Sequence, residues 1–401
     1  MRKKVLGNGL TIIINKRPSQ SVSIEAAVKV GSNDETKRIF GISHFIEHML
    51  FEGTKKRPNS IIISNEIEKL GGELNAYTTN ERTCFYIKVP KKHFGIALDI
   101  LSDILQNPLL ENKSIEKERK VILKEINMVN DQPRFYQWIL FNKTLFQKHP
   151  AKNPVYGTIE AVKRITGKEL AGYYKKHYLP NNTVISVVGD VSNAENQIAK
   201  KFADFKKGEL PIAKKSIEPA QKNIRKKTEK RRILSSYVVI GYKTVPRARK
   251  DSYSLDVIKA LLGRGQSGRI VEEIRNKRGL AYEVNAHHEP SLSYGFFAVY
   301  LNTDKKSIAN SLKIVLNELK LQNLTEQEIS DAKGYLEGQY VLEKEDTHEE
   351  ADTLNFWELA GNASLAENYT KNIKKITKKE ILTVAKRYFT KNYALAVIEQ
   401  N

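Results

Sequence analysis

Cysteine, methionine and tryptophan are scarce in this chain of 401 residues, which has 1, 3 and 2 of them. The single Cys84 cannot form an internal disulfide, which favours a reducing cytoplasm, and no Cys–His signature marks it as a nucleophile. Long apolar runs are missing too, so the sequence predicts no membrane span. Near the N-terminus Asn8-Gly9 interrupts the apolar residues with a hairpin signal, which predicts a first pair of strands and not an export signal.

Acidic residues are outnumbered, with 46 Asp and Glu against 67 Lys and Arg, for a formal net charge of +21. Such a charge suits nucleic acid or an acidic membrane surface. The lysines are nevertheless spread over the whole chain among the acids, and no arginine-rich block carries interleaved aromatic residues. We therefore expect neither a nucleic-acid partner nor a membrane partner. Salt-sensitive retention on a nucleic-acid column would contradict the first expectation.

An internal repeat divides the chain into two halves. The segment ITGKEL at 165–170 returns as ITKKEI at 376–381, an offset of 211, and an apolar extended run follows each copy. An offset near half the chain length indicates a duplicated domain, not a solenoid of short units. We predict a first domain over 1–209, a basic, solvated linker over 210–231 and a homologous second domain over 232–401.

Within each half, strand patterns are interspersed with long helical ones. Residues 22–30 alternate between apolar and polar, as a half-buried strand does, and 85–89 form a second such run. Helical periodicity predicts helices over 42–51, 61–70, 94–106 and 113–129. This combination predicts an α+β fold in which each domain is a mainly antiparallel sheet with one face covered by helices, not a doubly wound parallel sheet.

The sharpest local signal is the run GISHFIEHMLF at 41–51. His44 and His48 are four residues apart, so on a helix both imidazoles project from one face, and Glu47 lies beside them. The other side chains are almost all apolar, which predicts a helix buried nearly all round. Burying three titratable groups without a purpose is costly, whereas a zinc ion bound by neutral imidazoles removes that cost.

A catalytic zinc ion needs a third protein ligand, and the helix predicted over 113–129 offers Glu116, Glu118 and Glu125. Spacing alone does not decide between them. Apolar neighbours favour Glu125 as the ligand, while Glu118 lies on the same face and is a candidate to orient a histidine. Glu116 has charged neighbours, which indicates a solvated position.

HxxEH is the inverted zincin motif, and the chain resembles the pitrilysin/insulinase family of zinc peptidases over essentially its full length. The matching segments are Gly31-Ser32, Glu35, 41–48, the downstream glutamates Glu118 and Glu125, GGELNAYT at 71–78, YLPNN at 178–182, VGD at 188–190 and RNKRGLAY at 275–282. The short chain with two halves is similar to the branch of bacterial and mitochondrial processing peptidases.

The resemblance implies a zinc endopeptidase that hydrolyses peptides or unfolded polypeptide segments with one Zn²⁺ per chain. It makes His44, His48 and Glu125 the ligands and Glu47 the general base. Family members of this size usually work as dimers whose domains form half-clamshells around a chamber, so a cytoplasmic homodimer is expected. A non-catalytic partner or core subunit of the same fold is the alternative.

Two further sites follow from the resemblance alone. Arg275 and Tyr282, supplied by the second half, are implied to contact the substrate and to stabilise developing charge. Asn75 and Ala76 are implied to lie on the edge strand that binds substrate by backbone pairing, so sequence preference should be loose. The chain departs from the family pattern after His149-Pro150, where it has alanine in place of an aromatic residue.

Overall fold

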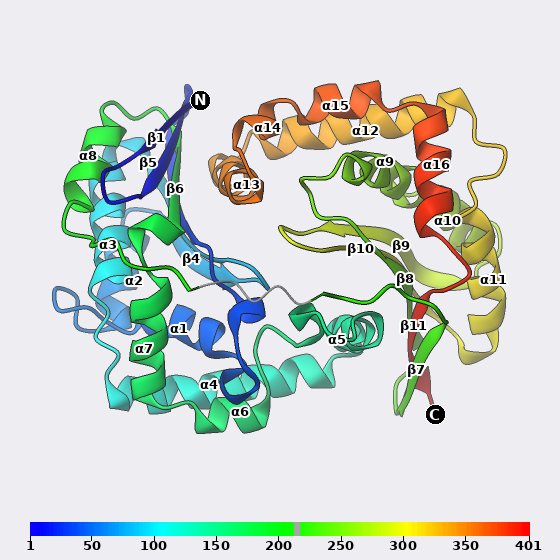
Figure 1. The fold of residues 1–401 in the computed structure, drawn as a ribbon, viewed down its shortest axis with the longest axis horizontal. Helices are drawn as coiled ribbons and strands as arrows, with labels where there is room; N and C mark the ends of the chain where they lie inside the picture. The colour runs from blue at the N-terminus through cyan, green and yellow to red at the C-terminus, as the bar shows by residue number, and fades with distance from the viewer. Residues whose placement is uncertain (212–216) are drawn as a thin grey trace. The chain divides into compact units, whose positions relative to one another are not determined.

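The computed structural model describes residues 1–211 and 217–401 (Figure 1). The described chain forms two compact units that do not follow the halves of the sequence. Unit 1 comprises residues 1–127, 153–211 and 343–366, and unit 2 comprises 128–152, 217–342 and 367–401. Each unit therefore contains a segment from the other half of the chain, which the boundaries drawn from the sequence do not include.

Unit 1 is built on a six-stranded sheet in the order β1-β2-β6-β3-β5-β4. Neighbouring strands run antiparallel except for β2 and β6, which are parallel. The strands are β1 (Arg2–Val5), β2 (Thr11–Lys16), β3 (Ser21–Val28), β4 (Glu73–Thr78), β5 (Thr83–Pro90) and β6 (Thr183–Gly189). The expected α+β fold with a mainly antiparallel sheet is confirmed for this unit.

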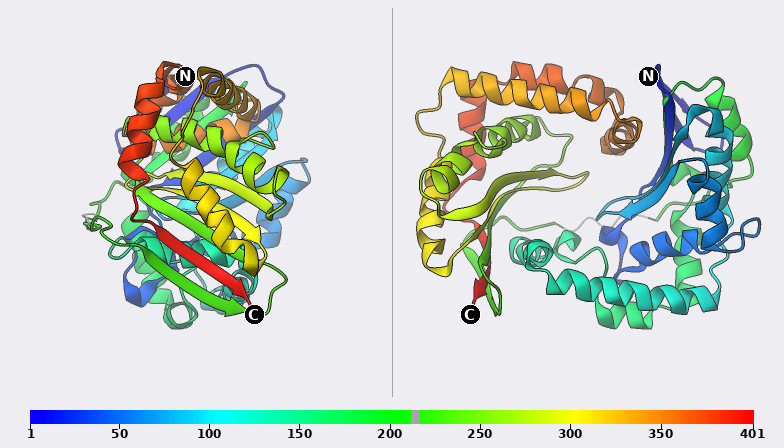
Figure 2. Two further views of the ribbon diagram at one scale, coloured as in Figure 1. Left: turned by 90° about the vertical axis from the view of Figure 1, so that its right-hand side faces the viewer. Right: turned by 180° about the vertical axis from the view of Figure 1, so that it is seen from behind.

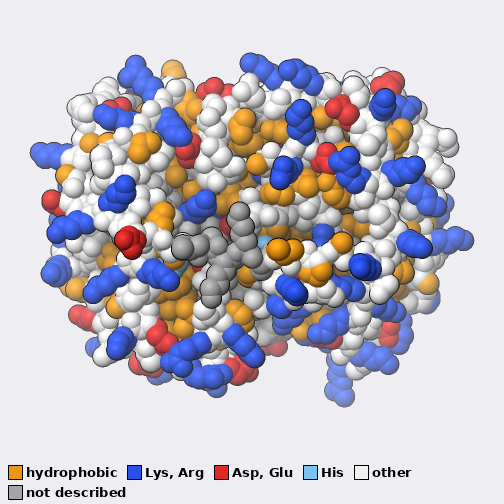
Figure 3. All heavy atoms as spheres, viewed as in Figure 1, with side chains coloured by type: hydrophobic (Ala, Val, Ile, Leu, Met, Phe, Trp, Pro, Cys, Tyr) orange, Lys and Arg blue, Asp and Glu red, His pale blue; other side chains and the backbone are white. Residues whose placement is uncertain are grey.

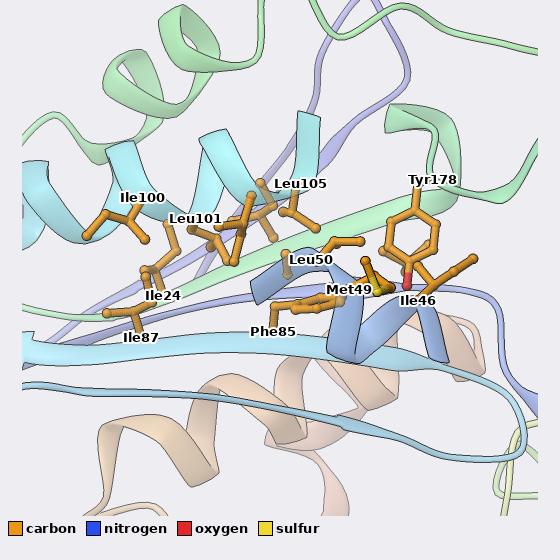
Figure 4. Packing of buried hydrophobic residues seen from close by; sticks show 14 of the residues in the cluster. Ile24, Ile46, Met49, Leu50, Phe85, Ile87, Ile100, Leu101, Leu105 and Tyr178 are labelled. Carbon is orange, nitrogen blue, oxygen red and sulfur yellow. The ribbon is translucent and has the colours of Figure 1, made fainter. Parts of the chain in front are cut away.

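One face of this sheet carries the apolar core. Alternate residues of β3 and β5, such as Ile24 and Ile87, pack there against Met49 and Leu50 of one helix and Leu101 of another (Figure 4). The helices of unit 1 are α1 (Ile42–Phe51), α2 (Ser60–Glu68), α3 (Phe94–Gln106), α6 (Ile159–Arg164), α7 (Gly167–His177), α8 (Ala194–Lys201), α13 (Thr347–Ala360) and most of α4 (Asn112–Asp131) and α14 (Ser364–Glu367). The apolar periodicity of α1 and α3 thus places the HxxEH helix directly on the sheet.

The opposite face of the sheet is polar but is also covered, which the sequence did not indicate. Ser23 and Glu25 of β3 point to this face and are fully buried. Helix α13, from the second half of the sequence, packs on β3 and β6 there. The alternation in β3 therefore reflects an apolar interface on one side and a polar interface on the other, not a solvent-exposed face.

Unit 2 repeats this topology with a five-stranded sheet in the order β7-β11-β8-β10-β9. Figure 2 shows β11 between β7 and β8, parallel to the first and antiparallel to the second. The strands are β7 (Arg225–Arg231), β8 (Ser236–Thr244), β9 (Ala281–Pro290), β10 (Gly295–Thr303) and β11 (Ala394–Gln400). The helices are α5 (Pro133–Leu145), α9 (Asp251–Gly263), α10 (Arg269–Val271), α11 (Ile308–Glu318), α12 (Glu326–Glu343), α15 (Tyr369–Lys375) and α16 (Lys378–Tyr388).

The duplication extends to single residues. The two copies of the repeated segment begin α7 and α16 with the same capping box, Thr166 with Glu169 and Thr377 with Glu380. Each threonine accepts a hydrogen bond from the N–H of its glutamate, which binds the threonine N–H in return. The two domains are therefore homologous in fold, as the repeat predicted.

The predicted linker over 210–231 needs correction at its C-terminal end. Residues 212–216 of it lie outside the described residues, but 225–231 form β7, which pairs in parallel with β11. The sequence RKKTEKR looks like a solvated loop because β7 is an edge strand with most of its side chains exposed. Its counterpart β2 lies between two strands and is apolar, so only β2 carries a strand signal.

None of the described helices is long and apolar enough to cross a membrane. On the face drawn in Figure 3, Lys and Arg side chains are spread over both units and outnumber the acidic side chains among them. That distribution matches the scatter of lysines along the sequence.

Candidate metal and peptide site

The helix that carries the HxxEH motif begins at a partly buried carboxyl group. Glu35 accepts hydrogen bonds from the N–H groups of Gly41 (2.7 Å) and Ser43 (2.9 Å) at the N-terminus of α1. Burial raises the pKa of Glu35 to about 8 against the lowering effect of these bonds. Because donors at a helix N-terminus otherwise lack partners, Glu35 fixes the start of α1 and with it the direction of His44.

Gly41, the residue before α1, has no room for a side chain. Its φ is +94°, and a Cβ there would lie 2.5 Å from the carbonyl oxygen of Tyr156. Replacing Gly41 with alanine should therefore destabilise the chain by about 3 kcal/mol through strain and a backbone clash. Gly71 is a matched control, since its φ of +71° is also unfavourable but nothing lies within 4 Å of its Cβ position.

We expect Gly71→Ala to cost only about 1 kcal/mol, the penalty of the left-handed backbone alone. Denaturant unfolding of both variants measures the difference. Equal losses of stability in the two variants would show that the backbone near Tyr156 shifts away from the added methyl group without a cost in stability.

The structure brings His44, His48 and Glu125 together around one point. Oε2 of Glu125, on α4, is 3.6 Å from Nε2 of His44 and 3.7 Å from Nε2 of His48. These separations are too long for hydrogen bonds. They are close to the distance of about 3.4 Å that separates two ligand atoms of a tetrahedral zinc ion with bonds of about 2.1 Å.

The residues fit a zinc ion in their hydrogen bonding as well. Among the described residues, Oε2 of Glu125 and Nδ1 of His44 are buried and have no hydrogen-bond partner. Burial lowers the pKa of His44 to about 4, so its imidazole is neutral and able to bind a metal. Burial lowers the pKa of His48, but the hydrogen bond to Glu118 and the nearby carboxylates of Glu125 and Glu47 outweigh it and raise this pKa to about 9. A cation at the shared point would pair with Oε2 of Glu125 and with Nε2 of both imidazoles, whereas Nδ1 of His44, the other nitrogen of its ring, would not reach it.

Glu118 lies behind His48. Its Oε2 is 2.9 Å from Nδ1 of His48, which leaves Nε2 of that ring directed at the candidate metal position. Glu116, the third glutamate of this helix, has an exposed side chain (64%) and pairs with Arg119. The structure therefore separates the three glutamates of α4 by their contacts, as their neighbours in sequence suggested.

Glu47 is 9% exposed and is placed for a different role. The hydroxyl of Thr78, the last residue of β4, donates a hydrogen bond to its Oε2. Burial raises the pKa of Glu47 to about 7, partly opposed by this bond and by His48. Thr78 belongs to the strand segment singled out in the sequence, but its contact with Glu47 was not anticipated.

An aromatic ring does lie beside the site, although not at the position after His149-Pro150. The ring of Tyr156 meets that of His44 edge to face, with 5.3 Å between the centroids. Tyr156 precedes Gly157, whose φ is +78°. A tyrosine before a glycine turn is too common a pattern to have identified this contact from the sequence.

Asn75 and Ala76 lie on β4, the edge strand of the sheet in unit 1. The Ala76 N–H donates to the Asn75 side chain at 2.8 Å, and α1 packs against the same strand. An identical Asn-Ala pair, Asn285 and Ala286, makes the same bond on β9, the edge strand of unit 2. Among the described strands β4 pairs with β5 alone, so its outer edge has no strand partner.

Arg275 and Tyr282 lie together in unit 2. The guanidinium carbon of Arg275 is 5.5 Å from the centroid of the Tyr282 ring, and Tyr282 is 84% exposed. Arg275 belongs to a π-helical turn (Glu272–Asn276), a geometry that is frequent at functional sites. An exposed tyrosine with an arginine against its ring is a feature that a stable core does not require.

The sequence matches two family descriptions in succession. Residues 10–159 match Insulinase (Peptidase family M16), and residues 164–336 match the Peptidase M16 inactive domain. An uncharacterized zinc protease of Streptomyces coelicolor is 32% identical over 99% of this chain and 89% of its own length. A protein of Bacillus subtilis with the same description is 29% identical over 98% and 96%.

Solved structures show the same fold. A protease from Helicobacter pylori superimposes with a TM-score of 0.94 at 21% identity and covers 99% of both chains. A structure from Pseudomonas fluorescens described as a peptidase M16 inactive domain gives a TM-score of 0.90 at 19% identity, over 100% of this chain and 98% of its own. The chain therefore belongs to the M16 peptidase family, in its two-domain branch.

Proposed function

We propose that this chain is a zinc-dependent endopeptidase that cleaves peptides or unfolded polypeptide segments. The observation that carries the proposal is the grouping of two imidazoles and one carboxylate around a common point, with Glu47 beside them and an open strand edge next to them. Any two of these features occur by chance in other proteins. All of them together match the requirements of metal-assisted peptide hydrolysis.

His44, His48 and Glu125 would hold the zinc ion, which when bound polarises the scissile carbonyl and makes a water more acidic. Glu47 would take the proton of the attacking water and return it to the leaving amine. The edge of β4 at Asn75 would hold the peptide as an added strand.

Arg275 and Tyr282 are proposed to contact the substrate, on the strength of the family resemblance and of their exposed pairing in unit 2. A tyrosine hydroxyl could donate to the oxygen on which negative charge develops during hydrolysis. The same resemblance supports a homodimer, which light scattering of the purified chain would test.

Metal removal tests the proposal directly. The purified chain should contain about one zinc ion per molecule, and a chelator should abolish cleavage of a fluorogenic peptide and of unfolded casein. Addition of zinc should restore both activities. The proposal fails if the folded chain contains no zinc, or if cleavage continues after the zinc has been removed.

A non-catalytic subunit of the same fold is the second candidate, because one of the two matched descriptions is of an inactive domain. The two candidates differ in one result. A zinc-containing chain that cleaves no member of a diverse peptide pool, alone or mixed with a partner, would favour the non-catalytic subunit.

A further inference from the structure

Helix α13 is fastened to the polar face of the unit 1 sheet by side chains that the proposed chemistry does not use. Asp352, on this helix, accepts a hydrogen bond from the hydroxyl of Tyr77 in β4. It also binds Arg82 through both carboxylate oxygens, at 2.9 and 3.0 Å. The Arg82 guanidinium lies between the rings of Tyr77 and Phe356, 5.4 and 5.3 Å from their centroids.

Tyr77 and Arg82 stand on the two sides of the turn that joins β4 to β5. The N–H of Thr79 bonds to the carbonyl of Arg82, which closes this hairpin. Asp352 therefore binds both arms of the hairpin at once, one through a phenol and the other through a guanidinium. A carboxylate that accepts bonds from a cation and a hydroxyl makes charge-assisted contacts, which are stronger than neutral ones.

The hairpin is in direct contact with a candidate catalytic residue. Consecutive residues of a strand point to opposite faces, so Tyr77 points to α13 while Thr78 points to α1, where it donates to Glu47. The strand edge at Asn75 is two residues away. A shift of Tyr77 would therefore move both the donor to Glu47 and the edge proposed to bind the peptide.

A polar interface is not required to dock a helix in this fold. The counterpart of α13 in unit 2 is α5, which packs on the corresponding face of its sheet through an apolar cluster that includes Leu140, Phe141, Val239 and Ala396. Helix α5 also makes polar contacts with its sheet, an exposed ion pair from Arg134 to Glu283 and hydrogen bonds from Arg225 to the carbonyls of Thr144 and Leu145. It contains no acidic residue, however, so it has no counterpart of Asp352. Buried polar contacts of this kind fix a unique geometry more than they add stability.

The same cluster resembles a second metal site. Donor atoms of Glu25, Cys84 and Asp352 lie within 4.8 Å of one another. The charge of Asp352 is already matched by Arg82, which also lies near Cys84 and keeps the pKa of Asp352 low in spite of burial. Glu25 has an imidazole beside it, since Nε2 of His348 is 3.3 Å from its Oε2, and against the effect of burial this carboxylate raises the pKa of the imidazole. A cation there would be repelled by the Arg82 guanidinium. The cluster therefore holds α13 to the hairpin and does not form a metal site.

We propose that Asp352 is a positioning residue, which through Tyr77 and Arg82 holds the β4–β5 hairpin in the register that peptide binding and Glu47 need. The proposal rests on the peptidase function for its effect on activity, but not for its effect on the hairpin. The proposal also gives α13, a helix from the second half of the sequence, a role in the site of unit 1.

The test compares Asp352→Asn with Glu350→Gln. Glu350 lies on the same helix, is more buried than Asp352 (5% against 26% of the side chain exposed) and pairs with Arg17 at 3.0 Å, next to β2 on the far side of the sheet from β4. Amide hydrogen exchange over 73–83 should become about tenfold faster in Asp352→Asn and remain unchanged in Glu350→Gln. Kinetics with a fluorogenic peptide should show an approximately tenfold loss of kcat/KM in Asp352→Asn, mainly as a higher KM, with a change below about twofold in the control.

Three results would overturn the proposal. Equal exchange rates over 73–83 in the two variants would show that Asp352 does not hold the hairpin. Equal kinetic losses would reduce its role to general stability. A second zinc ion per chain that disappears in Asp352→Asn would make the cluster a metal site. If the unaltered chain cleaves no peptide, the peptidase function fails, while the exchange measurement still decides whether Asp352 holds the hairpin.

Discussion

Replacing Glu47 with glutamine is expected to reduce peptide cleavage by about 10³-fold while the zinc content remains at one ion per chain. Glutamine keeps the size of the side chain and can still accept the hydrogen bond from Thr78, but it cannot take a proton from water. A loss of this size corresponds to about 4 kcal/mol of transition-state stabilisation. Because Glu47 is not among the atoms grouped around the candidate metal position, metal binding should survive.

Glu52 provides the matched control for this variant. It follows the same helix, its side chain is 11% exposed, and it pairs with Lys117 at 2.7 Å. Glu52→Gln should retain cleavage within about twofold, since a single ion pair of this kind contributes little. Initial rates on a fluorogenic peptide, with zinc measured on the same samples, make the comparison. Cleavage by Glu47→Gln within tenfold of the unaltered chain would remove Glu47 from the mechanism.

Much of the fold was accessible from the sequence because its signals are local. The helices at 42–51 and 94–106 were predicted with the bounds they have, since each combines strong apolar periodicity with a clear end. The repeat predicted the duplicated topology, and the structure adds that α7 and α16 begin with the same capping box. Local signals do not report which sheet a helix packs against, so the sequence did not predict those contacts.

The exchange of α5 and α13 between the halves shows this limit. Both helices have ordinary lengths and neither has a strongly amphipathic pattern, so nothing in their sequences says which sheet each will cover. The same holds for β7, whose charged residues suit an edge strand as well as a loop. Only the tertiary structure distinguishes these alternatives.

For the site, the sequence indicated residue types and helical faces but not contacts between helices. The spacing of His44 and His48 predicted that both face one point, which the structure shows. The preference for Glu125 over Glu116 rested on neighbouring residues, because α4 could have packed with either glutamate inward. Contacts such as Thr78 with Glu47 or Asp352 with Tyr77 join residues 31 and 275 positions apart, and a single sequence has no pattern that reports them.

The three glutamates of α4 give a graded test of the candidate metal site. Glu125→Gln should weaken zinc binding by about 10²- to 10³-fold, because a zinc site of four ligands contributes roughly 10–16 kcal/mol and one ligand accounts for about a quarter of it. Glu118→Gln should weaken it by only about 10- to 100-fold, since Glu118 orients His48 and does not reach the shared point. Glu116→Gln should have no effect, because that side chain is exposed and remote from the histidines.

Competition with a chromophoric chelator measures the three affinities, and circular dichroism checks that each variant remains folded. The order of the losses carries the argument more than their size, because all three changes replace one carboxylate by one amide on the same helix. If Glu118→Gln released zinc more readily than Glu125→Gln, the two roles would have to be exchanged. Unchanged binding in Glu125→Gln would leave Glu47 as the remaining carboxylate beside the histidines, so that it would have to be the ligand and could not be the base.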